Sequence, residues 1–290
     1  MKVFHHWMKL APWALSASLL VGCHPKRMAP PLEAEAPVAL TAAEAEECRF
    51  KPPPPYQPTP EQNEKDQIYS LVAYAVVYRN WQEASVGVGV RGYNIGSVLV
   101  DPSGRLVCWA RNAVGVTGNK TQHGEVRLMT NYLHNTTGGA LGGGYTVYTT
   151  LEPCAMCSGM MTLMSVKSTV YGQADPDFGK ALERLSFNST AIHGFCSYPR
   201  GVTSGEVIHA IAERLDQGYA RYMQTHPPVI TDFLASPEAR QIFADAEQQL
   251  LTFKVQFPSN QPVLDSALAF LQGVPREYTE TPYTTNCQAP

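Results

Sequence analysis

The sequence predicts an α/β fold, a three-layer α-β-α sandwich that carries a helical C-terminal extension. Within residues 64–83, apolar residues recur at the spacing of an amphipathic helix. Residues 93–100 and 106–110 are rich in β-branched and aromatic side chains and flank the turn Asp-Pro-Ser-Gly, which is typical of a β-hairpin. Helix and strand patterns then alternate as far as residue 172, an order that places helices on both faces of one sheet.

The later elements follow from local signals. A polar loop leads into a predicted helix over 123–133, and strands are predicted over 145–151 and 168–172. Another helix begins after Pro153, because proline suits the first turn of a helix. Beyond Asp177 the pattern weakens, and the predicted helices there are 206–223, 238–253 and 264–271. We expect the core to cover residues 61–180 and the helical extension, residues 181–290, to pack on it.

The N-terminus has the pattern of an export signal. Two lysines come before an apolar run, residues 10–22, that is too short to span a membrane permanently. The run ends in Leu-Val-Gly-Cys and resembles the lipobox of bacterial lipoproteins. That resemblance implies that a signal peptide, residues 1–22, is removed and that Cys23 carries a lipid anchor. His24, in place of an aspartate, favours the outer membrane or the periplasmic face. The alternative is an ordinary secretory signal that ends near a cysteine.

Residues 23–60 indicate an extended, Pro-rich tether between this anchor and the folded part. Residues 24–60 contain ten of the chain's 23 prolines, interspersed with Ala and Glu. That composition cannot bury a core and favours polyproline-like geometry.

The charge balance disfavours a dedicated nucleic-acid binder. The chain of 290 residues has a formal net charge of -3 and a pI near 6.2, so it has no overall basic surface for a phosphate backbone. Local basic patches are compatible with this composition, and an RNA or DNA substrate stays open.

The seven cysteines divide into groups. Cys108 lies in an apolar strand pattern, which predicts a buried free thiol. Cys48 and Cys287 flank the folded part, and an exported protein can join them in a disulfide. The pairing of these two and of Cys196 cannot be deduced from sequence.

Cys154 and Cys157 are predicted metal ligands. Residues three apart lie on one face of a helix, and a helix N-terminus stabilises thiolate charge. His123, which follows the polar loop, is the expected third ligand. Three protein ligands leave one position of a tetrahedral zinc site open, as in catalytic sites. Zinc lowers the pKa of bound water toward about 7, and Glu125 is placed to take the proton that this water releases.

The motifs H-x-E and P-C-x-x-C together form the signature of zinc nucleobase deaminases. With their neighbours they resemble the cytidine deaminase superfamily, and most closely its branch of tRNA-adenosine and guanine deaminases. The resemblance covers about residues 65–180, and its motifs are residues 95–100, Asn112, 123–125, 150–160, 170–172 and 175–176.

This resemblance implies a fold of the cytidine deaminase type and a hydrolytic reaction that releases ammonia. His123, Cys154 and Cys157 would bind Zn²⁺, Glu125 would carry the proton, and Asn112 would hydrogen-bond the substrate. The implied substrate is a nucleobase or nucleoside of the adenine, cytosine or guanine type. A homo-oligomer is a further expectation. Gly124 departs from the alanine that relatives commonly carry, which costs up to about 1 kcal/mol in a helix and is expected to clear space beside the metal.

Three alternatives remain. The chain can be a nucleic-acid deaminase, including an effector that acts on foreign RNA or DNA. It can be a binding module in which zinc only staples the fold, although such a site has no need of Glu125. The pair Cys154 and Cys157 can also be a disulfide or a redox pair. The sequence leaves open which base is attacked and what residues 181–290 do.

Overall fold

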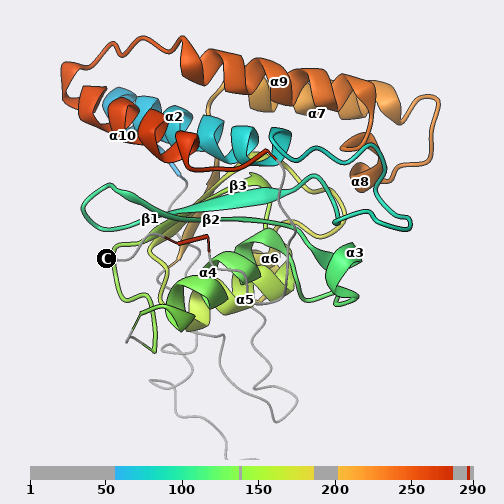
Figure 1. The fold of residues 1–290 in the computed structure, drawn as a ribbon, viewed down its shortest axis with the longest axis horizontal. Helices are drawn as coiled ribbons and strands as arrows, with labels where there is room; N and C mark the ends of the chain where they lie inside the picture. Colours follow the sequence, from blue (N-terminus) through green and yellow to red (C-terminus); the bar gives the residue numbers. More distant parts are fainter. Residues whose placement is uncertain (1–55, 137–138, 186–201, 277–285, 288–290) are drawn as a thin grey trace, which may run out of the picture. The chain divides into compact units, whose positions relative to one another are not determined.

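The computed structural model describes residues 56–136, 139–185, 202–276 and 286–287 (Figure 1). The elements of the N-terminal part are α2 (Pro60–Tyr78), β1 (Gly96–Val100), β2 (Leu106–Arg111), α3 (Val114–Thr117), α4 (Gly124–His134), β3 (Thr146–Leu151), α5 (Ala155–Leu163) and β4 (Ser168–Gln173). They are followed by α6 (Ala181–Arg184), β5 (Thr203–Glu206), α7 (Ala210–Tyr222), α8 (Ile230–Phe233), α9 (Pro237–Leu251), the 3-10 turn η2 (Pro258–Asn260) and α10 (Gln261–Gln272).

The described strands form one mixed sheet in the order β2-β1-β3-β4-β5. The predicted hairpin is confirmed, because β1 pairs antiparallel with β2. Strand β1 also pairs antiparallel with β3, whereas β3, β4 and β5 run parallel to one another. The sequence did not predict β5, which is short, contains a glycine, and ends at the residue where the helix 206–223 was expected to begin. That helix is α7, which begins later, at Ala210.

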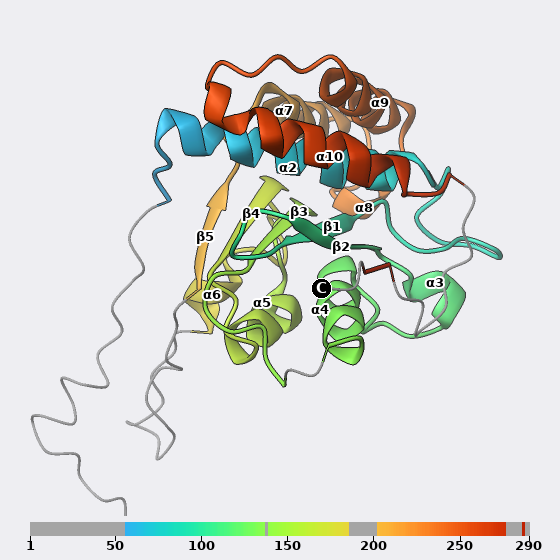
Figure 2. The same cartoon turned by 60° about the vertical axis from the view of Figure 1, so that its left-hand side comes forward.

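Helix α2 covers one face of the sheet. It begins earlier than predicted, because Thr59 caps it by accepting a hydrogen bond from the backbone N–H of Gln62, and Pro60 occupies the first turn. Twelve of its 19 residues are buried, so the helix is enclosed on more than one side. Its neighbours on the side away from the sheet are α9 and α10 (Figure 2).

Helices α4 and α5 cover the opposite face. Alternation along β1 and β3 divides the core: Val98 and Tyr148 pack on the α2 side, and Leu99 and Val147 pack on the α4 side. The residues that the two helices contribute to the second cluster are Leu128, Met129, Tyr132 and Met161. The predicted three-layer α-β-α arrangement is confirmed.

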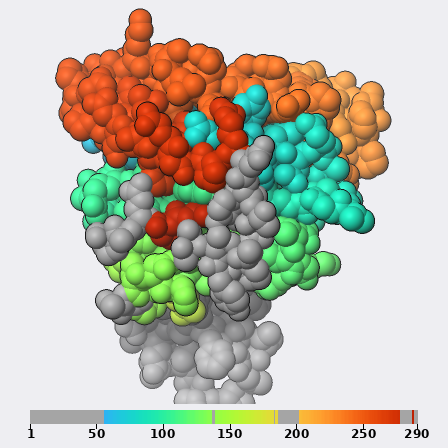
Figure 3. Space-filling model, in the orientation of Figure 1, coloured from blue at the N-terminus to red at the C-terminus, as the bar shows by residue number. Residues whose placement is uncertain are grey.

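The C-terminal helices add a further layer beyond α2 (Figure 3). Phe243 of α9 meets the ring of Tyr74 edge-on, with ring centroids 5.0 Å apart. Arg79, at the end of α2, donates to Glu247 of α9 at 2.7 Å in a mostly buried ion pair. These contacts join the N-terminal helix to the last third of the chain. The predicted helices 238–253 and 264–271 are confirmed as α9 and α10, with small changes at their ends.

The prediction that Cys108 is a free thiol is wrong. Cys108 forms a disulfide with Cys287, 179 residues further along the chain. Strand β2 lies at the edge of the sheet, and there the backbone of the C-terminal tail pairs with it, since Trp109 N–H donates to the carbonyl of Asn286. The possible bridge between Cys48 and Cys287 is therefore excluded, because Cys287 is already paired.

Several predictions lie outside the described residues. They are the signal peptide, the lipidated Cys23, the tether as far as residue 55, and the state of Cys48 and Cys196. In the part of the chain that the structure describes, no helix is long and apolar enough to cross a membrane. The expected boundaries at residues 60 and 180 stay predictions.

A pair of carboxyl groups lies between β5 and α7. Burial, followed by the negative charge of Asp216, raises the pKa of Glu206 to about 7. Burial also raises the pKa of Asp216, although hydrogen bonds from Glu206, Gln173 and the backbone of Ala174 oppose that rise. The pair is accordingly most stable while it holds a proton.

Replacing Glu206 should change how stability depends on pH. The pKa of Glu206 is higher in the folded protein than its ordinary value of 4.5. The stabilising contribution of this carboxyl to the folded state is therefore fully present below pH 4.5 and is lost as the pH rises through about 7. We expect Glu206→Gln to make the free energy of unfolding, measured by denaturant titration, less dependent on pH between about 5 and 8. Glu83→Gln, which changes an exposed carboxylate that does not act on Glu206, is the control, and equal pH dependence of the two variants would contradict the prediction.

Candidate metal centre and active site

His123 and Cys154 stand at the beginnings of two helices on the same side of the sheet. His123 is the N-cap of α4 and Cys154 is the N-cap of α5, and both have extended backbone geometry. Neither side chain makes the hydrogen bond of an N-cap. Imidazole and thiol are therefore free to bind a ligand, while the helix N-termini favour negative charge beside them. Cys157 follows in the first turn of α5.

The structure brings together the three predicted metal ligands. Nδ1 of His123 lies 3.7 Å from Sγ of Cys154 and 3.6 Å from Sγ of Cys157, and the two sulfurs are 3.6 Å apart. Tetrahedral zinc with bonds of about 2.3 Å to sulfur and about 2.0 Å to nitrogen requires ligand atoms roughly 3.5–3.8 Å apart. The observed triangle fits that requirement. Among the described residues, this is the group of histidine, cysteine and acidic side chains that could hold a metal ion.

Glu125 lies in the first turn of α4 and is buried, with 3% of its surface exposed. Its Oε1 accepts a hydrogen bond of 3.4 Å from the hydroxyl of Thr149, whereas its Oε2 is buried without a hydrogen-bond partner in the described structure. Burial raises the pKa of this carboxyl, and the nearby His123 partly opposes the rise. A buried carboxyl with one free oxygen is suited to pick up and release a proton.

The ligands also influence one another electrostatically. Hydrogen bonding to Cys157, followed by that to His123, lowers the pKa of Cys154 to about 4. The pKa of Cys157 is raised by its hydrogen bond to Cys154 and by burial. For His123, burial lowers the pKa, but the hydrogen bond to Cys154 and the charge of Glu125 outweigh burial and raise it. Metal coordination would replace this sharing of protons, because zinc binds deprotonated thiolates and neutral imidazole.

A pocket of about 430 Å³ opens beside these residues. His123, Glu125 and Cys154 line it, whereas Cys157 is fully buried behind them. The remaining lining residues are Tyr93, Ile95, Lys120, Leu151, Glu152, Met156, Asp175, Asp177, Phe178, Val229, Ile230 and Thr231. Its size is that of a site for a small organic molecule.

Asn112, the predicted substrate-binding residue, lies beside the pocket and does not line it. Its Oδ1 accepts hydrogen bonds of 3.2 Å from the backbone N–H groups of Tyr93 and Val114. Its Nδ2 is buried and has no hydrogen-bond partner within the described part of the chain. The side chain thus positions Tyr93 in the pocket wall and keeps one unused donor. Its direct contact with a substrate stays a prediction.

Two parts of the pocket wall were not found from the sequence. Phe178 follows β4, and residues 229–231 come from the beginning of α8. Neither carries a motif, and α8 is too short to give a periodic pattern. Glu152 also lines the pocket. Its carboxylate also accepts hydrogen bonds from the backbone N–H groups of Asp175 and Lys180.

The expectation that Gly124 clears space beside the metal is wrong. A Cβ at this position would lie 3.2 Å from Oγ of Ser97 and 3.3 Å from Cα of Gly96, both in β1. Gly124 therefore faces the sheet, and its missing side chain allows α4 to begin directly against the strand.

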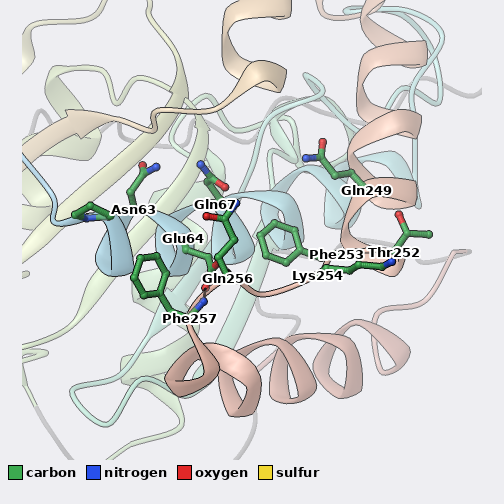
Figure 4. Close-up of a pocket in the computed structure, with 10 residues that line it drawn as sticks. Asn63, Glu64, Gln67, Gln249, Thr252, Phe253, Lys254, Gln256 and Phe257 are labelled. Carbon is green, nitrogen blue, oxygen red and sulfur yellow. Dashed lines mark hydrogen bonds between the residues drawn. The ribbon is translucent and has the colours of Figure 1, made fainter.

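A second pocket, of about 530 Å³, lies between the beginning of α2 and the segment that joins α9 to α10 (Figure 4). It is lined by Pro60, Asn63, Glu64, Gln67, Gln249, Thr252, Phe253, Lys254, Gln256 and Phe257. Glu64 is occupied by hydrogen bonds from the backbone of Gln256 and Phe257 and from the side chain of Asn260. None of the predicted site residues lines this pocket, so the metal centre belongs to the smaller one.

A mixed sheet between helix layers, with His, Cys and Cys ligands at two helix N-termini, defines a zinc-binding α/β protein of the deaminase class. The family model of the cytidine and deoxycytidylate deaminase zinc-binding region matches residues 73–173, which include all of the predicted site residues except the anchor. A probable cytosine deaminase of Schizosaccharomyces pombe is 30% identical over 148 residues, which are 48% of this chain and 83% of the relative. The chain belongs to this deaminase family.

Other similar proteins differ in the base that their names specify. The tRNA-specific adenosine deaminase of Haemophilus influenzae is 28% identical over 130 residues, which are 45% of this chain and 70% of that protein. The structure of guanine deaminase from Bacillus subtilis is 22% identical, covers 40% of this chain and 72% of its own, and superposes with a TM-score of 0.33. The predicted family is confirmed, and the base is left undetermined.

If His123 is a metal ligand, its replacement should remove zinc, whereas replacement of His134 should not. His123→Ala removes one of three ligands, so we expect zinc content, measured by elemental analysis after dialysis, to fall from about one ion per chain to a small fraction of that. His134→Ala changes a histidine at the other end of the same helix and should keep the metal. Equal zinc content in the two variants would rule out His123 as a ligand.

Proposed function

We propose that the chain is a zinc-dependent hydrolytic deaminase that acts on the amino group of a nucleobase or nucleoside of the adenine, cytosine or guanine type. The observation that carries this proposal is Glu125, a buried carboxyl with one free oxygen, at the wall of a pocket that also holds His123 and Cys154. A zinc ion that only stabilises the fold does not require a buried carboxyl beside it. Membership of the deaminase family supports the same reaction.

The residues at the pocket would have separate roles in this reaction. His123, Cys154 and Cys157 would hold zinc, which would supply Lewis-acid activation of the attacking water. Glu125 would take one proton from the attacking water at its free Oε2 and deliver it to the ring nitrogen. It would then move a second proton, from the newly formed hydroxyl group, to the departing amino group. The balanced reaction consumes one water and converts the amino group to a carbonyl group with release of ammonia. Leu151, Ile95 and Met156 present apolar surface to the ring and limit access of further water.

Glu125→Gln tests the proposal because it removes the proton carrier and leaves the three ligands in place. We expect the rate of ammonia release by zinc-loaded protein to fall at least about 100-fold, the usual contribution of a general acid–base group. The variant should keep its zinc and its melting temperature. Adenosine, cytidine, guanine and short single strands serve as substrates.

If the wild-type protein releases ammonia from none of these substrates, the chain is not a deaminase of this kind. The alternative of a binding module stapled by zinc would then stand. If Glu125→Gln is as active as the wild type, Glu125 is not the proton carrier.

We also propose that the protein is exported and tethered to a membrane through a lipid on Cys23. The N-terminal pattern supports this, and so does the disulfide between Cys108 and Cys287, because structural disulfides are rare in the cytosol and common in exported proteins. The expected location is the outer membrane or another membrane surface that faces the periplasm.

Cys23→Ser tests the anchor. In a bacterial host, we expect the wild-type chain to incorporate labelled fatty acid and to sediment with membranes, whereas the variant should lose the label. The variant Cys287→Ser, which changes a cysteine far from the signal, should keep the label. Unlabelled wild-type protein in the soluble periplasmic fraction would indicate an ordinary secretory signal.

A further inference from the structure

One wall of the deaminase pocket is formed by Phe178 and residues 229–231. Phe178 lies just after the matched family model, which ends at residue 173, and residues 229–231 lie outside the region of about residues 65–180 that resembles the family. They face a pocket that His123, Glu125 and Cys154 also line. The chemistry thus belongs to the region that resembles the family, whereas residues 229–231 of the C-terminal extension help to shape the entrance.

The segment at α8 is fixed firmly in place. Ile230, Phe233 and Leu234 are buried in the cluster on the α2 side of the sheet, with 4%, 0% and 1% of their surfaces exposed. The carbonyl of Leu234 accepts a hydrogen bond of 3.0 Å from Nδ2 of Asn94, which lies between the pocket residues Tyr93 and Ile95. A further hydrogen bond joins Ser85 to Asp232. This wall is part of the folded core and requires no closing movement.

Phe178 is an exposed aromatic ring on a well-ordered loop. Its side chain is 62% exposed, yet its backbone N–H donates to Oδ1 of Asp175 at 2.9 Å. Glu152 holds both ends of the loop through Asp175 and Lys180. At Gly179 any Cβ would lie 2.1 Å from Oε2 of Glu152, so the loop packs tightly on that carboxylate. An aromatic face held at a pocket mouth is suited to stack on a planar ring.

The charges around the pocket are mainly negative. Its lining contains four acidic residues and, besides the ligand His123, one basic residue, Lys120, which is exposed at the rim. A phosphate group at the entrance would face the carboxylate of Asp177 and the carboxylates behind it. Sites that hold a nucleic-acid backbone instead present a positively charged groove.

We propose that the wall formed by Phe178 and residues 229–231, together with the carboxylates beside it, restricts the site to free, uncharged bases or nucleosides and rejects phosphorylated nucleotides and strands. This inference rests on the proposed deaminase function. The pocket volume of about 430 Å³ suits a single base with its sugar. The ring enters between the exposed face of Phe178 and the apolar surface of Val229 and Ile230.

A charge reversal at the entrance tests the rejection of phosphate. With zinc-loaded full-length protein, kcat/KM is measured by ammonia release for the preferred nucleoside, its 5′-monophosphate and a short single strand that contains it. We expect the wild type to prefer the nucleoside at least about tenfold, because like charges a few ångströms apart repel. Asp177→Lys should raise the ratio of monophosphate to nucleoside about tenfold. Asp265→Lys, the same charge change on the exposed side of α10, is the control and should leave the ratio unchanged.

A truncation tests the stacking face. Phe178→Ala should raise KM for the nucleoside about tenfold with little change in kcat, since it removes a ring that binds the base and takes no part in proton transfer. Leu163→Ala is the matched control, because Leu163 is 61% exposed and does not line the pocket.

The outcomes separate this inference from the proposed function. If the monophosphate or the strand is used as well as the nucleoside, or if Asp177→Lys leaves the ratio unchanged, the wall does not select the substrate, and the deaminase assignment stands. If Phe178→Ala behaves like Leu163→Ala, the ring does not hold the base. If no substrate releases ammonia, both proposals are overturned.

Discussion

The close packing of helix α4 on strand β1 determines where the metal centre forms. Because Gly124 has no side chain, the first turn of α4 lies directly on Gly96 and Ser97, and a Cβ there would be 3.2–3.3 Å from atoms of the strand. This contact places His123 on one side of the glycine and Glu125 on the other. Strand β3, which pairs with β1, then delivers Cys154 at the beginning of the neighbouring helix α5. The carboxyl of Glu125 and the three ligand atoms therefore lie close together, because the backbone already brings their residues near one another.

The elements that carry local signals could be predicted from the sequence, and those that depend on distant partners could not. The hairpin, α4, β3 and α5 have turn residues, periodicity or a proline in the right place, and the ligands within them follow from motif spacing. The disulfide of Cys108 joins strand β2 to a tail 179 residues away, and an apolar strand pattern around a cysteine contains no information about such a partner. Strand β5 is stable only as an edge strand beside β4. The wall at α8 is held by Asn94 and by buried side chains of other elements.

The last third of the chain has two physical roles that depend on each other. Helices α9 and α10 bury the outer side of α2, α7 packs on α9, and the ion pair of Arg79 with Glu247 ties α2 to α9. The same packing fixes Phe233 against the rings of Tyr219 and Tyr222, with centroids 5.6 and 5.8 Å apart, and so positions the preceding residues over the pocket. Substitutions inside this layer would therefore affect stability and substrate access together, whereas substitutions at exposed Phe178 or Val229 would affect access alone.

The two described pairs of cysteines have opposite chemical requirements. Cys108 and Cys287 must be oxidised to join the tail to the sheet edge. Cys154 and Cys157 must stay reduced, because a disulfide would remove both thiolates from the metal centre. Their sulfurs are 3.6 Å apart, so only a small movement separates them from bonding distance, which is about 2.05 Å. Cys154 is also partly exposed.

In an oxidising compartment, bound zinc would protect Cys154 and Cys157 by occupying both sulfurs, and loss of the metal would leave a vicinal dithiol open to oxidation. The metal ligands therefore constrain the proposed export: an exported enzyme of this design requires that zinc binds before, or faster than, oxidation.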